Sequence, residues 1–81
     1  GYSLAEKGHA SLAVYDIDGR LVRTLVDAEC EAGPHSLVWD GCNDRGQRLA
    51  SGIYFIRYRA GDDSFWRKAA LLNPIDALRY E

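Results

Sequence analysis

The sequence lacks the features that mark a membrane-spanning or nucleic-acid-binding protein. No apolar run approaches the roughly 20 residues needed to cross a bilayer. Ten basic and 12 acidic residues give a net charge of −2 and a pI near 5.6, which argues against nucleic acid or an anionic membrane as a partner. No signal peptide is present either, but because the chain starts at Gly1 and not at Met, that absence says little about location.

The sequence also lacks a catalytic constellation. His9 and His35 are far apart, and neither has a Ser or Cys partner at a spacing typical of a nucleophile and its base. We therefore expect both histidines to be surface or strand-end residues. The expectation that follows is a protein that is not an enzyme and has no cofactor.

Oxygen-bearing side chains gather in two predicted turns, and they are the weak candidates for a calcium site. Carboxylate and amide oxygens bind calcium, and two turns at one pole of a domain could share an ion. The spacing does not match an EF-hand loop, however, and Asp and Asn favour turns for conformational reasons of their own. We therefore predict ordinary turns and no bound metal. The residues that would be the weak candidates for calcium ligands are Asp16, Asp18, Asp40, Asn43 and Asp44.

The chain has only two cysteines, Cys30 and Cys42. An even number suggests a disulfide. A predicted strand separates the two, however, and would hold their Cα atoms beyond the roughly 7 Å that a disulfide tolerates. We predict two unpaired thiols, although secreted proteins usually pair theirs.

The residues that are present predict one small all-β domain. The chain has 81 residues, of which 47% are hydrophobic and 27% charged, a balance typical of a globular fold and not of a disordered chain. No helical periodicity of useful length occurs. Short β-prone runs alternate with turns every eight to twelve residues, which predicts an antiparallel sandwich or barrel.

The clearest local signal is AVYDIDGRLVRTLV, where Asp18-Gly19 predicts a type I′ hairpin between strands at residues 11–17 and 20–26. The other expected strands are residues 35–40, 47–50, 53–59 and 65–72. Alternation along these strands predicts the following core side chains: Leu12, Val14, Leu37, Trp39, Tyr54 and Ile56.

Four stretches, in this order, carry a resemblance to a known family: VYDIDGRLVRTL, AGPHSLVWDG, NDRGQRLASGIYFIRYRAGD and RKAALL. Together they resemble the FlgD-type immunoglobulin-like domain, a C-terminal module of secreted bacterial proteins that is related to the type IX secretion sorting domain. The resemblance covers about residues 2–72. It implies an antiparallel Ig-like or fibronectin-III-like β-sandwich of about seven strands.

The resemblance also bears on the two ends of the sequence. Domains of this family open with an Asn-Pro phrase and a first strand, whereas this sequence begins with GYSLAEKG and ends with NPIDALRYE. We therefore expect residues 1–72 to form the sandwich and residues 73–81 to supply a displaced first strand. The side chains expected to make its contacts are Ile75, Ala77, Leu78 and Tyr80.

Such a strand could complete the sandwich of its own chain or of a neighbour. In an Ig-like topology the first and last strands enter and leave at opposite poles. Asn73 and Pro74 span at most about 7 Å, whereas a six-residue strand is roughly 20 Å long. If the topology is Ig-like, completion of its own sandwich is strained, and donation to a neighbour is the natural alternative, which would give a head-to-tail oligomer. An appended segment, a linker, one turn of helix and an engineered extension are the alternatives.

The resemblance implies a structural module of a secreted or cell-envelope bacterial protein, with a role in sorting, anchoring or strand-donation assembly. Its partners would be proteins, either a second copy or other domains of the parent protein. The alternative is an accessory carbohydrate- or protein-binding module of a secreted hydrolase. A sugar platform would draw on these aromatic residues, about half of which the core must use: Tyr15, Tyr54, Phe55, Tyr58, Phe65 and Trp66.

Overall fold

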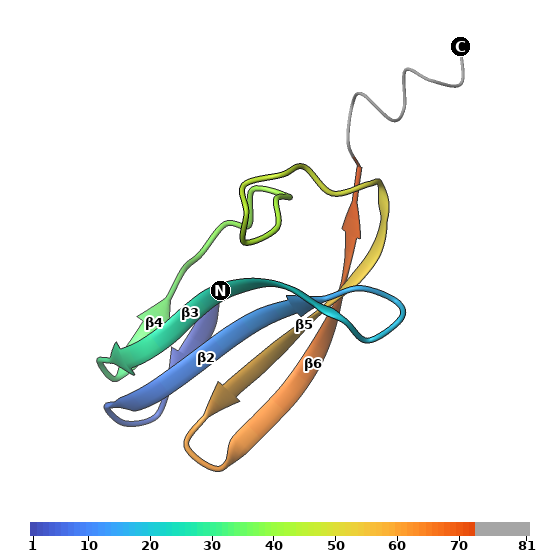
Figure 1. Cartoon of the computed structure of the whole chain (residues 1–81). Helices are drawn as coiled ribbons and strands as arrows, with labels where there is room; N and C mark the ends of the chain where they lie inside the picture. Colours follow the sequence, from blue (N-terminus) through green and yellow to red (C-terminus); the bar gives the residue numbers. More distant parts are fainter. Residues whose placement is uncertain (73–81) are drawn as a thin grey trace.

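The computed structural model describes residues 1–72, which form six strands in two antiparallel sheets (Figure 1). The strands are β1 (Tyr2–Leu4), β2 (Gly8–Tyr15), β3 (Leu21–Cys30), β4 (Gly33–His35), β5 (Gly52–Ala60) and β6 (Asp63–Leu71). This arrangement is consistent with the expected Ig-like sandwich, and a seventh strand is not found among the described residues. No helix occurs there, and so none that is long and apolar enough to cross a membrane.

The larger sheet has the strand order β3-β2-β5-β6, and the smaller sheet pairs β1 with β4. Two hairpins, β2-β3 and β5-β6, are joined through the antiparallel pair β2-β5, in which Leu12 lies opposite Tyr58. The β5 sequence GIYFIRYRA is rich in β-branched and aromatic residues, which favours a strand that is paired on both edges. The strongest predicted strand therefore lies in the middle of the sheet.

The loop between β2 and β3 differs from the predicted type I′ turn. The Asp16 N–H donates to the Arg20 carbonyl and the Gly19 N–H to the Asp16 carbonyl, and Gly19 has a φ of 84°. No other residue type has a positive φ among residues 1–72, so Asp18 does not adopt the conformation that type I′ requires. The pattern is a three-residue loop closed by a glycine bulge. The Asp16 carboxylate favours it by accepting the Asp18 and Arg20 N–H groups.

The same loop occurs a second time at residues 43–47. The Asn43 N–H donates to the Gln47 carbonyl, the Gly46 N–H donates to the Asn43 carbonyl, and Gly46 has a φ of 78°. The Asn43 side-chain oxygen accepts the Arg45 and Gln47 N–H groups, as the Asp16 carboxylate does in the hairpin. Asp and Asn are interchangeable here because each presents an oxygen to the N–H groups two and four residues later.

The core lies between the two sheets. Of the six side chains expected there, Leu12, Val14 and Tyr54 are buried. Trp39 is half-buried, with its ring edge-on to Tyr54 at 5.4 Å, and its indole N–H donates to the Cys42 carbonyl. Ile56 is half-buried as well. Burial of Leu4 adds a contribution from β1 that the sequence did not indicate.

Two predicted strands are wrong. The strand expected at residues 35–40 ends at His35, and Leu37 is 41% exposed and not in the core. The strand expected at residues 47–50 is only one isolated bridge, between Cys42 and Arg48. Local hydrogen bonds explain the first error, because the Asp40 carboxylate accepts the Cys42 N–H and the Trp39 indole bonds the Cys42 carbonyl. These bonds turn the backbone before a ladder can form.

Candidate binding groove

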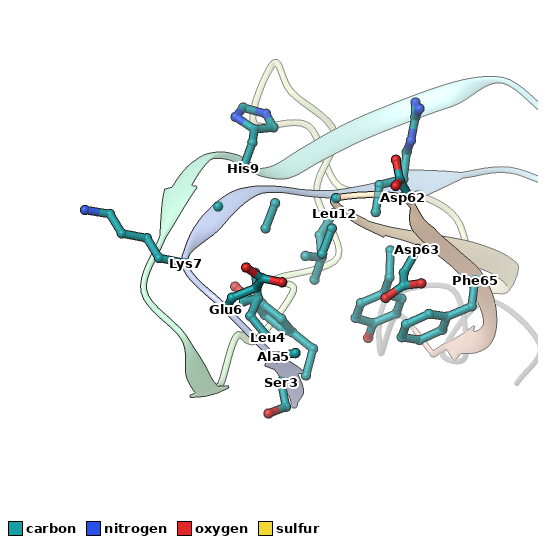
Figure 2. A pocket seen from close by; sticks show the side chains of 17 residues that line it. Ser3, Leu4, Ala5, Glu6, Lys7, His9, Leu12, Asp62, Asp63 and Phe65 are labelled. Carbon is teal, nitrogen blue, oxygen red and sulfur yellow. The ribbon is translucent and has the colours of Figure 1, made fainter.

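A groove of about 540 Å³ lies between β1 and the β5-β6 hairpin (Figure 2). Leu4 and the turn at residues 5–7 form one wall, and Tyr58 and Phe65 form the opposite wall. Ala10 and Leu12 of β2 also line it. The groove is therefore an opening into the space between the two sheets.

The groove is open because the smaller sheet is too short to cover the larger one. β1 and β4 have three residues each, whereas β5 and β6 have nine each. β4 occupies one edge of β1, and no strand among residues 1–72 pairs with the other edge. The part of β6 that an additional strand beside β1 would cover is left open.

The backbone of Ser3 lies at this unpaired edge. Ser3 is opposite Pro34 in the ladder, and Pro34 has no N–H to donate, so the pair is of the non-hydrogen-bonded kind. In such a pair the N–H and C=O groups of both residues point away from the partner strand. The Ser3 N–H and C=O therefore point away from β4, on the edge of β1 that borders the groove.

Aromatic rings line the β6 side of the groove. Phe65 is 47% exposed, and its ring stacks on Tyr58 with centroids 4.7 Å apart and planes 5° apart. Tyr2 contacts Tyr58 from β1 at 6.1 Å. The Arg67 guanidinium lies 5.9 Å from the Tyr58 centroid and 5.8 Å from that of Phe65. A partly exposed stack that faces the inside of a sandwich is a surface suited to an apolar partner.

Charges at the groove are mixed. The wall carries Glu6, Asp62 and Asp63, and also Lys7 and His9. The last two point to partners on β3 or just after it: Lys7 lies 3.7 Å from Glu31, and His9 lies 2.6 Å from Asp27. No single sign of charge dominates, so the groove does not select a strongly charged ligand.

Tyr2 is the titratable residue whose environment the groove alters. Burial raises the pKa of its hydroxyl, and proximity to Cys30 and to Tyr58 raises it further. The ring also stacks on His35 of β4, with centroids 5.2 Å apart. Tyr2 is therefore a neutral aromatic side chain that joins β1 to β4 and to the larger sheet.

The calcium candidates do not form a metal site. Among residues 1–72, no group of three or more His, Cys, Asp or Glu residues is placed to hold an ion. Each candidate instead bonds locally or to a neighbouring strand: the Asp18 carboxylate accepts from the Arg20 guanidinium, the Asp40 carboxylate from the Cys42 N–H, and the Asp44 carboxylate from the Thr24 N–H. Asp16 and Asn43 close the two loops described above.

Cys30 and Cys42 are free thiols and both are half-buried. The Cys30 thiol lies 3.6 Å from the Ala28 carbonyl, and the Cys42 thiol lies 3.9 Å from the Asp40 carbonyl. The hydrogen-bond partner of each thiol among residues 1–72 is a backbone carbonyl and not a histidine.

The aromatic residues considered for a sugar platform are divided between the two faces of the larger sheet. Tyr58 and Phe65 lie at the groove, whereas Tyr15 and Trp66 lie on the outer face with centroids 5.2 Å apart and planes at 59°. The Arg57 guanidinium lies 5.4 Å from the Trp66 ring. Tilted rings on opposite faces do not form one flat surface on which a sugar chain could stack.

The sequence pattern did not reveal the groove. Phe65 is predicted only as a possible sugar contact, and Ser3 and Leu4 are not among the predicted site residues. One available signal was Pro34, because a proline within a strand indicates an edge or a pair that needs no N–H. The side chains expected to make strand contacts (Ile75, Ala77, Leu78 and Tyr80) lie outside the described residues.

Comparison with known proteins gives one family and two curated relatives. Residues 2–64 match the family model of the FlgD Ig-like domain. The chain is 41% identical over 49 residues to the basal-body rod modification protein FlgD of Salmonella typhimurium, and equally to that of Salmonella typhi. The alignment covers 60% of the chain and 21% of each relative, so the chain spans about a fifth of the length of the curated relatives it matches. No solved structure matches.

Proposed function

The chain belongs to the FlgD Ig-like domain family, whose members are non-catalytic modules, and from this premise we propose that it is a structural assembly module of a secreted or cell-envelope bacterial protein. Of the roles considered above, the groove favours strand-based assembly over sorting or anchoring. The relatives are named as proteins that modify the basal-body rod, which supports a role in assembly for this chain. Its partner would be a protein.

The observation that carries the proposal is the unpaired edge of β1 beside an exposed aromatic stack. The Ser3 N–H and C=O groups offer one donor and one acceptor to an added strand. Phe65 and Tyr58 offer an apolar surface to its side chains. Strand addition uses these two contributions together: main-chain hydrogen bonds give affinity and alternate side chains give register.

The strand that we propose for the groove is residues 73–81 of this protein. In an extended chain, Asp76, Leu78 and Tyr80 fall on one side and Ile75, Ala77 and Arg79 on the other. Leu78 and Tyr80 are suited to the groove and Arg79 to solvent. A strand in the groove would also cover Phe65, which would otherwise favour aggregation at an open edge.

Amide hydrogen exchange at Ser3 in the full chain tests this proposal. A strand in the groove would bond the Ser3 N–H, so we expect this amide to exchange at least roughly tenfold more slowly in the native chain than in the Leu78→Asp variant. Leu4 is the internal control, because its N–H bonds to β4 in both proteins. Arg79→Ser is the matched control variant. Equal Ser3 exchange in the native chain and in Leu78→Asp would show that residues 73–81 do not fill the groove.

A further inference from the structure

We infer that the strand in the groove comes from a second copy of the chain, runs antiparallel to β1 and joins the copies head to tail. This inference rests on the proposed function, since it specifies the partner of the same groove. It is carried by the direction of the strands and by the place where the described chain ends. Both are properties of the observed topology and not of the family resemblance.

The turns at residues 5–7 and 61–62 and the end of β6 lie at opposite poles of the domain (Figure 1). We define the near pole by the turns at residues 5–7 and 61–62, both of which line the groove. β6 starts beside this pole at Asp63 and leads away from it to Leu71. The chain therefore leaves the sheet at the far pole, where the Leu71 side chain lies against Gly41.

The direction of β1 fixes the direction of its partner. β1 runs toward the near pole, because the turn at residues 5–7 follows it there. Every strand pair among residues 1–72 is antiparallel. An antiparallel partner of β1 would therefore enter at the near pole and run toward the far pole, in the same direction as β6.

A strand from the same chain cannot easily meet this requirement. After Leu72 the chain would have to return along the whole of β6, whose nine residues span roughly 26 Å. Asn73 and Pro74 reach at most about 7 Å. If residues 75–81 went back directly, they would run parallel to β1, and parallel pairing is slightly less stable and normally uses a connection of a dozen or more residues.

A second copy meets the requirement without a reversal. Because the described chain of that copy ends at its own far pole, the segment that follows can enter the near pole of the next domain in the required direction. The contact is heterologous, since one copy gives the strand and the other gives the groove. Repetition of the contact produces an open chain or a ring of domains and not a symmetric dimer.

The side chains of the groove fit this arrangement. Phe65 and Tyr58 form the apolar surface for Leu78 and Tyr80 of the donor copy. The Arg67 guanidinium, which lies over the two rings, comes from the same face. No carboxylate among residues 1–72 pairs with Arg67, so it can contact the ring of Tyr80 or the donor's main-chain carbonyls.

Two variants of the full chain distinguish the copy that donates the strand from the copy that accepts it. Ser3→Pro removes the outward N–H of β1 and retains the bonds to β4, whereas Ser3→Ala keeps that N–H and is its control. Leu78→Asp replaces an apolar contact of the donated strand with a charge, and Arg79→Ser is its control. Ser3→Pro can then donate its strand but has a weakened groove. Leu78→Asp can accept a strand but has a weakened strand of its own.

The experiment is light scattering of each variant alone and of an equimolar mixture, over a concentration series. We expect the native chain and both controls to grow in mass with concentration. Each variant alone should stay at the mass of one chain, and the mixture should contain a complex with the mass of two. A mixture that stays at one chain, with a native chain that also stays at one chain, would overturn the inference.

Exchange at Ser3 shows which of the two proposals has then failed. Slow Ser3 exchange in a monomeric native chain means that the chain fills its own groove, so the second copy is wrong and only the placement of residues 73–81 in the groove stands. Fast Ser3 exchange in a monomeric chain would contradict both. Circular dichroism checks that each of the two variants is folded. If Ser3→Pro does not fold, Leu78→Asp provides the test by itself.

Discussion

Two edges of this sandwich are treated in different ways. At β3, a loop of the same domain closes the edge: the Asp44 N–H donates to the Val22 carbonyl, and the Asp44 carboxylate accepts the Thr24 N–H at 2.9 Å. At β1, nothing among residues 1–72 bonds the Ser3 backbone on its outer side. Because an unpaired edge is a template for another strand, the β1 edge beside the groove is where we propose that a strand is added.

The closed edge uses a loop that the domain also uses elsewhere. Residues 16–20 and 43–47 share the same hydrogen bonds, with Asp16 and Asn43 in the same role. The loop at residues 16–20 joins two strands. The loop at residues 43–47 lies against β3, where the Arg23 guanidinium donates to the Asn43 carbonyl. One local structure therefore serves either as a hairpin connection or as an edge cover, according to what it contacts.

Removal of Trp39 should have the largest effect, because it releases the segment that carries the closing loop. Trp39→Ala loses the contact with Tyr54 and the bond to the Cys42 carbonyl, and we expect a loss of about 3 kcal/mol in the free energy of unfolding. Urea denaturation followed by circular dichroism measures it. Trp39→Phe is the control: it keeps a ring and loses the hydrogen bond, so about 1 kcal/mol should be lost. Equal losses would show that packing contributes little.

Removal of the Asp44 carboxylate should open the β3 edge. Asp44→Ala leaves the Thr24 N–H without its acceptor, and we expect a loss of about 1 kcal/mol together with faster exchange of the Thr24 amide. Asp44→Asn retains a side-chain oxygen and should keep most of the protection. If Thr24 exchange is unchanged in Asp44→Ala, the loop does not act as an edge cover.

Removal of the Phe65 ring should separate stability from association at the open edge. The ring is 47% exposed, so Phe65→Ala should lower the free energy of unfolding of the separate domain by less than about 1 kcal/mol. Association measured by light scattering should nevertheless be lost, because the donated strand loses its apolar surface. Trp66→Ala is the matched control, since Trp66 is exposed on the opposite face of the same strand and should leave association intact.

The smallest expected effect is a difference in pH response between the two loops. The Arg20 and Asp18 N–H groups and the Arg20 guanidinium stabilise the Asp16 carboxylate and lower its pKa. The stabilisation is present above the ordinary carboxyl pKa of about 3.9 and is lost as pH falls through the lower folded value. The midpoint temperature of thermal unfolding should therefore fall less steeply with decreasing pH for Asp16→Asn than for the native chain in this acidic range. Identical slopes would contradict the assignment.

Much of the fold could be predicted from the sequence because it depends on neighbouring residues. The strands at residues 53–59 and 65–72 were found because β-branched and aromatic residues dominate them. The prediction at residues 35–40 was wrong because Leu37 and Trp39 alternate as in a strand, while the bonds from Trp39 and Asp40 to Cys42 turn the backbone. The groove could not be predicted, since alternation shows that a strand has two faces and not which of them is covered.

The sequence by itself determined the strands at residues 53–59 and 65–72 and the positions of the two glycine-closed loops, because these depend on bonds between residues a few positions apart and on the residue types present. The tertiary structure alone decided which edge is closed and which is open. Asp44 lies 20 residues from Thr24, and Ser3 is 31 residues from the Pro34 that turns its N–H outward. Contacts at such separations depend on how the sheets pack together, which no local pattern of residues records.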